Sequence, residues 1–161
     1  LSEKEQTTIY EAGLLHDIGK ILTPEAVLLK PRKCSRSEYE IIKKHCVDGE
    51  KMVLFISSFK EYATIIRHHH ERFDGNGYPE GLKGYDIPFC ARVVALADVY
   101  DALVTPRVYN KLYTHSEAMG IISDEKSKHF DPEIVEIFIN NNELKYIESK
   151  YKNNKGEKIT A

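Results

Sequence analysis

Apolar residues recur at helical spacing along most of this chain, and no segment alternates with the period of two that a half-buried strand requires. The sequence also lacks an internal repeat. Its 161 residues suit one domain with a single sizeable core. We therefore expect an all-α domain over residues 1–142, followed by a polar, lysine-rich tail over residues 143–161.

The apolar spacing and the capping residues predict where the helices lie. A first helix is expected over residues 3–22, with a buried stripe formed by Leu14, Leu15, Ile18, Ile21 and Leu22. Further helices are expected after Thr23 as N-cap, from Ser37 as N-cap to about Phe55, over about 59–71, from Pro88 to about Leu103, after Ser116 as N-cap, and from Pro132 to about Ile139 with Asp131 as N-cap.

The charge and composition exclude several classes of partner. The net charge is −2, so no broad basic surface is available for long nucleic acid or for an anionic membrane. No apolar run reaches the roughly 18 residues of a membrane span, and the first residues lack a signal-peptide layout. The three cysteines are scattered, which favours a reducing, cytoplasmic setting, and Cys46 is interpreted as a small buried apolar residue.

Four segments place metal-binding side chains at polar breaks in apolar patterns. The first, "LLHDIGK", brings His16, Asp17 and Lys20 to one polar helix face, although such a motif alone is more often a solvated face. The second supplies His45 and the third "RHHHE" supplies two or more imidazoles. The fourth is an apolar helix that carries Asp98 and Asp101, where a metal would offset the cost of burying a carboxylate. Their combination indicates a metal site.

The stretch after the histidines cannot remain helical. Residues 73–88 contain Gly75, Gly77, Pro79, Gly81 and Gly84, and a loop of that length inside a domain is more often functional than idle. Glycine permits positive φ and close approach of backbone, whereas proline stiffens the exit. We expect a substrate loop, with an Ω-loop that packs a tyrosine as the alternative.

The segments "HDIGK", "HHERFDGNGYPEGLKG", "DVYDAL" and "HFDPEIVEIF" together resemble the HD-GYP subgroup of the HD-domain metal-dependent phosphohydrolases, collinearly from about residue 10 to about residue 139. The resemblance implies an HD-domain helical bundle with a long Gly/Pro-rich substrate loop. It also implies two, or in a subset three, divalent ions, with iron or manganese favoured over zinc, nickel or magnesium. The implied activity is hydrolysis of cyclic di-GMP to pGpG or GMP, in cytoplasmic bacterial signalling.

The resemblance also implies roles for individual residues. The implied metal ligands are His16, Asp17, His45, His69, His70 and Asp98, with Asp17 bridging two ions. Lys20 is similar to a catalytic lysine beside the scissile phosphate, and the implied substrate contacts are Gly75, Tyr78, Asp101, Arg107 and Lys111. His68, His115 and His129 have no ligand counterpart in the family pattern.

Two departures leave alternatives open. A further family histidine, and the glutamate of the three-metal subset, would precede Leu1, so we expect a fragment of a longer protein. Asn110 stands where the family has a basic residue, although Lys111 follows. The alternatives are hydrolysis of another cyclic dinucleotide or nucleotide, and a degenerate module that binds cyclic di-GMP or docks a diguanylate cyclase. An upstream sensor or receiver domain and a homodimer are compatible with the family resemblance.

Overall fold

The computed structural model describes residues 1–106 and 111–141, and within these ranges the chain is helical. The elements are α1 (Glu3–Leu15), η1 (Ile18–Leu22), α2 (Glu25–Leu28), α3 (Arg36–Lys43), α4 (His45–Leu54), η2 (Ser57–Tyr62), α5 (Ala63–His68), η3 (Gly84–Asp86), α6 (Phe89–Val104), α7 (His115–Asp124) and α8 (Pro132–Asn140). The expected all-α class is confirmed, and no strand occurs in the described ranges. None of the helices in those ranges combines the length and apolarity needed to cross a membrane.

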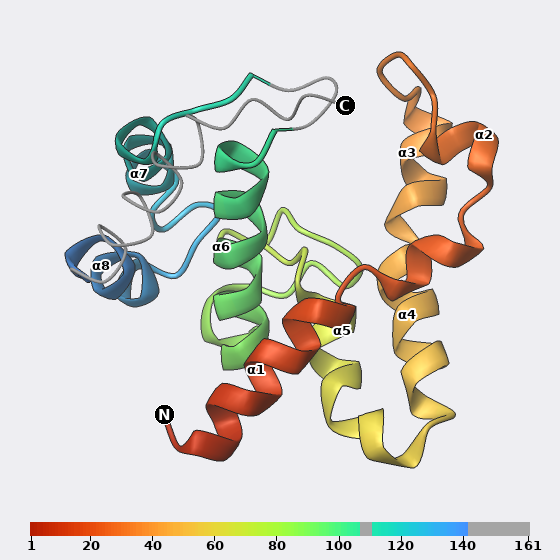
Figure 1. The fold of residues 1–161 in the computed structure, drawn as a ribbon, viewed down its shortest axis with the longest axis horizontal. Helices are drawn as coiled ribbons and strands as arrows, with labels where there is room; N and C mark the ends of the chain where they lie inside the picture. The colour runs from red at the N-terminus through yellow and green to blue at the C-terminus, as the bar shows by residue number, and fades with distance from the viewer. Residues whose placement is uncertain (107–110, 142–161) are drawn as a thin grey trace, which may run out of the picture.

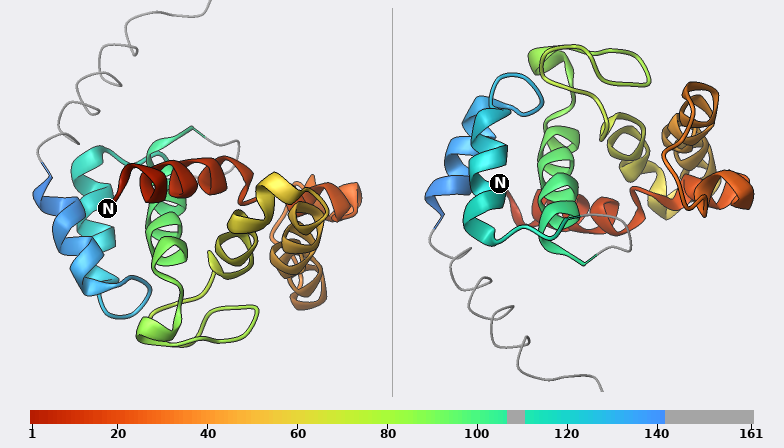
Figure 2. Two further views of the ribbon diagram at one scale, coloured as in Figure 1. Left: turned by 90° about the horizontal axis from the view of Figure 1, so that it is seen from below. Right: turned by 90° about the horizontal axis from the view of Figure 1, so that it is seen from above.

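Helix α6 is the centre of the arrangement. In the views of Figures 1 and 2, α7 and α8 lie on one side of α6 and α3 and α4 on the other, while α1 crosses α6 and α5 lies between α6 and α4. Val94 of α6 belongs to a core shared with α1, α4 and α5, whereas Leu96 belongs to a second core with α7 and α8. Because both sides of α6 are covered, its sequence is apolar nearly all round.

Helix termini agree with the expectation where the capping chemistry is unambiguous. Asp131 caps α8 through the Glu133 amide with Pro132 in the first turn, and Pro88 precedes α6, both as predicted. The predicted caps at Ser37 and Ser116 were wrong. Ser35 and Thr114 are the N-caps, since each exchanges side-chain and backbone hydrogen bonds with a glutamate three residues later.

The predicted helix over residues 3–22 was also wrong. Helix α1 ends at Leu15, and Asp17 leaves helical geometry with φ −97° and ψ 6° before the tighter turns of η1. The periodicity therefore fails beyond this break, where Ile21 and Leu22 are 68% and 60% exposed. Leu14, in the last turn of α1, is also 69% exposed. Thr23 ends η1 rather than capping the next helix, and Pro24 occupies that N-cap.

Gly19 and Gly49 explain how η1 packs directly against α4 after the break. A Cβ on Gly19 would lie 2.0 Å from the carbonyl oxygen of His45 and 2.5 Å from the amide nitrogen of Gly49. Backbone of η1 thus lies directly against backbone of α4, an approach that no side chain permits. This contact fixes the distance between the residues just before η1 and the first turn of α4.

The remaining long helices are interrupted as well. The expected helix through Phe55 breaks at Lys44 into α3 and α4, and Phe55 is 90% exposed. The expected helix over residues 59–71 is a 3₁₀ segment followed by α5, which ends at His68. The carbonyl oxygen of His70 accepts from the amide of Tyr78, so the loop takes the bond that a continuing helix would make.

Candidate metal centre

Three of the predicted ligand histidines share one backbone arrangement. The Nδ1 atoms of His16, His45 and His69 lie 2.6, 2.7 and 2.7 Å from the carbonyl oxygens three residues earlier in the chain. A carbonyl only accepts, so each Nδ1 carries the donated proton. This fixes the ring orientation and, in a neutral imidazole, leaves the Nε2 lone pair available to a metal.

Two of these Nε2 atoms lie next to the carboxylate of Asp17. His16 Nε2 lies 3.4 Å from Asp17 Oδ2, and His45 Nε2 lies 3.4 Å from Asp17 Oδ1. One carboxylate thus presents each oxygen to a different histidine. Asp98, from α6, places Oδ1 at 3.6 Å from His16 Nε2. The sequence placed these residues in separate helices, and the fold brings them together.

The buried histidines complete the cluster from the end of α5. His45 Nε2 and His69 Nε2 lie 3.4 Å apart, and the side chains of both residues are almost fully buried. The rings of His69 and His70 have centroids 4.1 Å apart. Donor atoms of His45, Cys46, His69 and His70 all lie within 4.8 Å of one another, as do those of His16, Asp17 and His69. His69 therefore belongs to two adjoining donor groups.

The polar atoms of the cluster are suited to a cation. His45 Nε2 and His69 Nε2 face each other with no proton on either atom when the rings are neutral, so two lone pairs oppose each other. Within the described residues, His16 Nε2 and Asp17 Oδ1 are buried without a hydrogen-bond partner. A buried polar atom without a partner is costly, and a divalent ion satisfies both a carboxylate oxygen and the lone pair of a neutral imidazole. The donor set fits a metal.

The protonation states follow from burial and neighbouring charge. Burial, with the neighbouring His70 and His16, lowers the pKa of His69 to about 2, and burial and His45 lower that of His70 to about 4. Burial also lowers the pKa of His45. For His16, burial opposes the charged form, but the carboxylates of Asp17 and Asp98 outweigh it and raise the pKa to about 10.

These shifts predict a pattern that a spectrum can test. In metal-free protein at pH 8, the ¹⁵N NMR signals of His16 should be those of an imidazolium, whereas His45 and His69 should be neutral with the proton on Nδ1. The folded pKa of His16 lies above its ordinary value of 6.5. The ion pair of His16 with Asp17 and Asp98 therefore stabilises the metal-free fold fully below pH 6.5. The stabilisation is lost as the pH rises through 10. A neutral His16 ring at pH 8 would contradict this electrostatic description.

Lys20 and the residues predicted to contact substrate lie in different parts of the structure. Lys20 Nζ donates to Asp17 Oδ2 at 2.5 Å. Asp101 and Asp98 line a cleft of about 440 Å³ beside the cluster. Its walls are formed by Ile9, Tyr10, Gly13, Leu14, His16, Asp17, Val94 and Ala97. Lys111 instead lies over the ring of Tyr113, with Nζ 4.7 Å from its centroid, and does not line this cleft. Arg107 falls outside the described residues.

The glycine-rich loop presents its tyrosine to the cluster. The ring of Tyr78 lies over His70 with centroids 4.9 Å apart, and Tyr39 meets Tyr78 edge to face at 6.2 Å. Gly75 has φ of +85° and supplies the turn, but it lies at the far part of the loop, near Lys83 and Gly81. The structure therefore brings Tyr78, rather than Gly75, to the histidines.

Glu71 is a residue that the sequence reasoning missed. Its buried carboxylate accepts hydrogen bonds from the backbone amides of Glu80, Gly81 and Leu82 at 2.8, 3.2 and 3.0 Å. A Cβ on Gly77 would lie 2.5 Å from the Glu71 Cα. The loop is thus tied to the residue directly after the two candidate ligand histidines, which holds Tyr78 against His70.

We expect Glu71→Gln to loosen this loop. The amide offers one acceptor oxygen in place of two, so at least one of the three amides loses its partner, at a cost of about 1–3 kcal/mol. Hydrogen exchange at Glu80, Gly81 and Leu82 should accelerate. Glu80→Gln is the matched control, since it removes the side-chain ion pairs with Arg67 and His68 but keeps the three amide bonds. Unchanged exchange in Glu71→Gln would rule out the anchor.

The other histidines have structural partners. His68 Nε2 lies 3.0 Å from Glu80 Oε2. His115 Nδ1 lies 2.9 Å from the Tyr100 hydroxyl. The ring of His129 stacks on Phe130, and its carbonyl oxygen accepts from the amide of Phe73. None of the three joins the donor groups formed by the described residues.

Comparison with known proteins places this geometry in context. A model of the HD domain family matches residues 1–134. A cyclic di-GMP phosphodiesterase of Vibrio cholerae is 43% identical over 138 residues, which cover 81% of this chain and 28% of that protein. The 3'3'-cGAMP-specific phosphodiesterase 1 of the same species is 36% identical, covering 91% of this chain and 34% of that protein. The chain thus spans about a third of the length of these relatives.

A solved structure is similar over most of the fold. An HDG"Y"P protein from Bdellovibrio bacteriovorus matches with a TM-score of 0.68 at 26% identity, covering 90% of this chain and 45% of that one.

Proposed function

Because this chain belongs to the HD domain family, and within it to the HD-GYP group, we propose that it hydrolyses the phosphodiester bonds of cyclic di-GMP to pGpG or GMP with two divalent ions, iron or manganese being favoured. HD domains depend on divalent metals, and the cluster offers the donors. The observation that carries the proposal is the pair of opposed contacts at Asp17, one oxygen toward His16 and the other toward His45.

The proposed ligands divide into two groups that share Asp17, and His69, whose free lone pair is on Nε2, belongs with His45 and His70. His16 and Asp98 would hold one ion with Asp17, while His45 and His70 would hold the other. The bonds from Nδ1 to backbone carbonyls keep the imidazoles from rotating away. Ions bound there supply Lewis-acid activation of a phosphoryl oxygen and a water that is nucleophilic at neutral pH.

Lys20 has the charge and position to act on the phosphate. Its side chain is 35% exposed and lies at the same carboxylate that joins the two histidines. An ammonium beside the reacting phosphate stabilises the negative charge that develops on its oxygens and can protonate the departing ribose oxygen. Asp17 holds Nζ in place through the 2.5 Å hydrogen bond. We therefore assign Lys20 a catalytic role.

The cleft beside the cluster suits part of a nucleotide. Its volume of about 440 Å³ lies within the range of small-molecule sites. Apolar walls from α1 and α6 suit a base or ribose face, and Tyr10, which is 68% exposed, offers a ring for stacking. Tyr78 borders the histidines from the loop side. The proposed substrate would reach the ions between these surfaces.

We favour cyclic di-GMP over 3'3'-cGAMP as the proposed substrate. The relative named for cyclic di-GMP is 43% identical to this chain, whereas the one named for 3'3'-cGAMP is 36% identical. Both nucleotides present the same phosphodiester linkage, so the same ions would serve either. The two substrates differ in one base, which only an assay can discriminate.

The experiment is a parallel turnover assay. Protein prepared anaerobically with manganese or iron is incubated with cyclic di-GMP and with 3'3'-cGAMP, and the products are separated by chromatography while bound metal is quantified. The proposal expects faster loss of cyclic di-GMP with formation of pGpG or GMP. Stoichiometric metal and tight nucleotide binding without cleavage would instead identify a binding module.

A further inference from the structure

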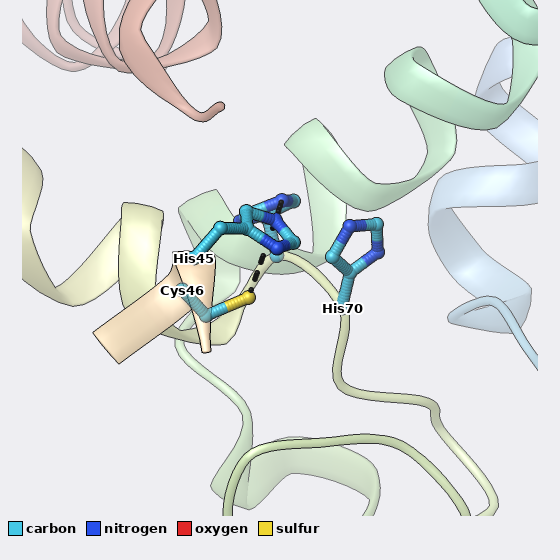
Figure 3. A group of neighbouring side chains, drawn as sticks. His45, Cys46 and His70 are labelled. Carbon is cyan, nitrogen blue, oxygen red and sulfur yellow. Dashed lines mark hydrogen bonds between the residues drawn. The ribbon is translucent and has the colours of Figure 1, made fainter. Parts of the chain in front are cut away.

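Cys46 lies within the metal centre although its sequence context suggested a packing role. Its side chain is fully buried, and Sγ lies 3.6 Å from His45 Nε2. Figure 3 shows the sulfur directed at the His45 ring, with His70 nearby. One donor atom from each of Cys46, His45, His69 and His70 fits within a span of 4.8 Å. The thiol is therefore part of a group of four donors.

The separations match the edges of a coordination polyhedron. A tetrahedral ion with metal–nitrogen bonds of about 2.1 Å and a metal–sulfur bond of about 2.3 Å separates two nitrogens by about 3.4 Å and nitrogen from sulfur by about 3.6 Å. The protein places His45 Nε2 at 3.4 Å from His69 Nε2 and at 3.6 Å from Cys46 Sγ. Both distances are therefore those expected between ligands of a single tetrahedral ion.

The local backbone holds the sulfur in this position. Cys46 follows His45 in the first turn of α4, and the His45 carbonyl is in contact with Gly19. The Nδ1 atom of His45 is held by the Ile42 carbonyl, so the Nε2 atom cannot turn away from the sulfur. The Cys46 side chain is fully buried, so Sγ faces the cluster rather than solvent.

We propose that Cys46 is a thiolate ligand of the ion held by His45 and His69. On binding, the thiol proton passes to solvent and a metal–sulfur bond forms. A soft sulfur donor biases this position toward iron, zinc or cobalt and away from manganese or magnesium. The inference rests on the metal site of the proposed function and goes beyond it, because it assigns a ligand and a metal preference to one of the two positions.

Cobalt(II) substitution tests the assignment with a readout independent of turnover. Thiolate bound to cobalt gives a charge-transfer band in the near ultraviolet, whereas imidazole and carboxylate ligands do not. Metal-free protein titrated with cobalt should develop this band as the ion binds, and Cys46→Ser should bind cobalt without it. Cys90→Ser and Cys34→Ser are matched controls, since both residues are free thiols outside the cluster, and each should keep the band.

Each other outcome of the cobalt experiment has a different consequence for the ligand assignment and for the proposed function. Stoichiometric cobalt without a thiolate band, or a band that survives in Cys46→Ser, overturns the ligand assignment and leaves the proposed hydrolysis intact. A Cys46-dependent band in protein that does not cleave cyclic di-GMP supports the assignment while overturning the function. Failure to bind cobalt at all overturns both. Competition should further show that Cys46→Ser weakens zinc binding by more than about tenfold relative to manganese.

Discussion

The Asp17→Asn protein is expected to lose bound metal and turnover together, with kcat falling by at least about 100–1,000-fold. The carboxylate directs one oxygen to His16 Nε2 and the other to His45 Nε2, each at 3.4 Å. An amide retains one oxygen, carries no charge and turns an N–H toward the other imidazole. The N–H therefore occupies a lone pair that the metal needs, and loss of the charge weakens the hydrogen bond from Lys20.

Metal analysis and turnover of the same preparation check this expectation. Asp48→Asn is the matched control, because Asp48 lies on α4 close to His45 in sequence but pairs with Lys51 at 3.7 Å on the surface. A surface pair of that kind contributes about 0–1 kcal/mol, so metal content and activity should not change. Full metal occupancy and activity in Asp17→Asn would remove the basis for the two-ion description.

Gly19→Ala should both destabilise the fold and separate the proposed metal ligands Asp17 and His45. The added Cβ would lie 2.0 Å from the His45 carbonyl oxygen and 2.5 Å from the Gly49 amide nitrogen, and backbone atoms cannot move aside as a flexible side chain can. Overpacking of this kind costs about 1–3 kcal/mol. Because the strained contact joins η1 to α4, relief of the clash must move Asp17 away from His45.

The measurement combines urea denaturation with a metal-binding titration. Gly120→Ala is the matched control, since Gly120 lies in α7 with no atom within 4 Å of the new Cβ. Alanine in a helix should stabilise that variant by about 0.5–1 kcal/mol and leave metal affinity unchanged. A Gly19→Ala protein with undiminished stability and metal affinity would show that the contact does not set the geometry.

The sequence was sufficient for the fold class and for the better-capped helices. The Asp131–Pro132 start of α8 and the apolar run of α6 were predicted because local chemistry and packing favour the same answer. Prediction failed after Leu15, where periodicity suggested a continuing helix. The turn there depends on contact between Gly19 and α4, which is a tertiary interaction that no local pattern reveals.

The candidate ligands were predictable as residue types, but their geometry was not. The sequence placed His16, Asp17, His45 and Asp98 at polar breaks, and the fold brings their donor atoms within 3.4–3.6 Å of a neighbour in the cluster. Glu71 was missed because its partners are backbone amides about ten residues later, which leave no side-chain signature. For Thr114, the signal was present, since Glu117 stands three residues on.

Anomalous X-ray diffraction from the iron-loaded protein tests the central claim most directly. The account predicts two peaks flanking the Asp17 carboxylate, one in reach of His16 and Asp98 and the other bounded by the Nε2 atoms of His45 and His69. Ordered histidines with no anomalous density among them, or iron bound only elsewhere on the surface, would contradict it.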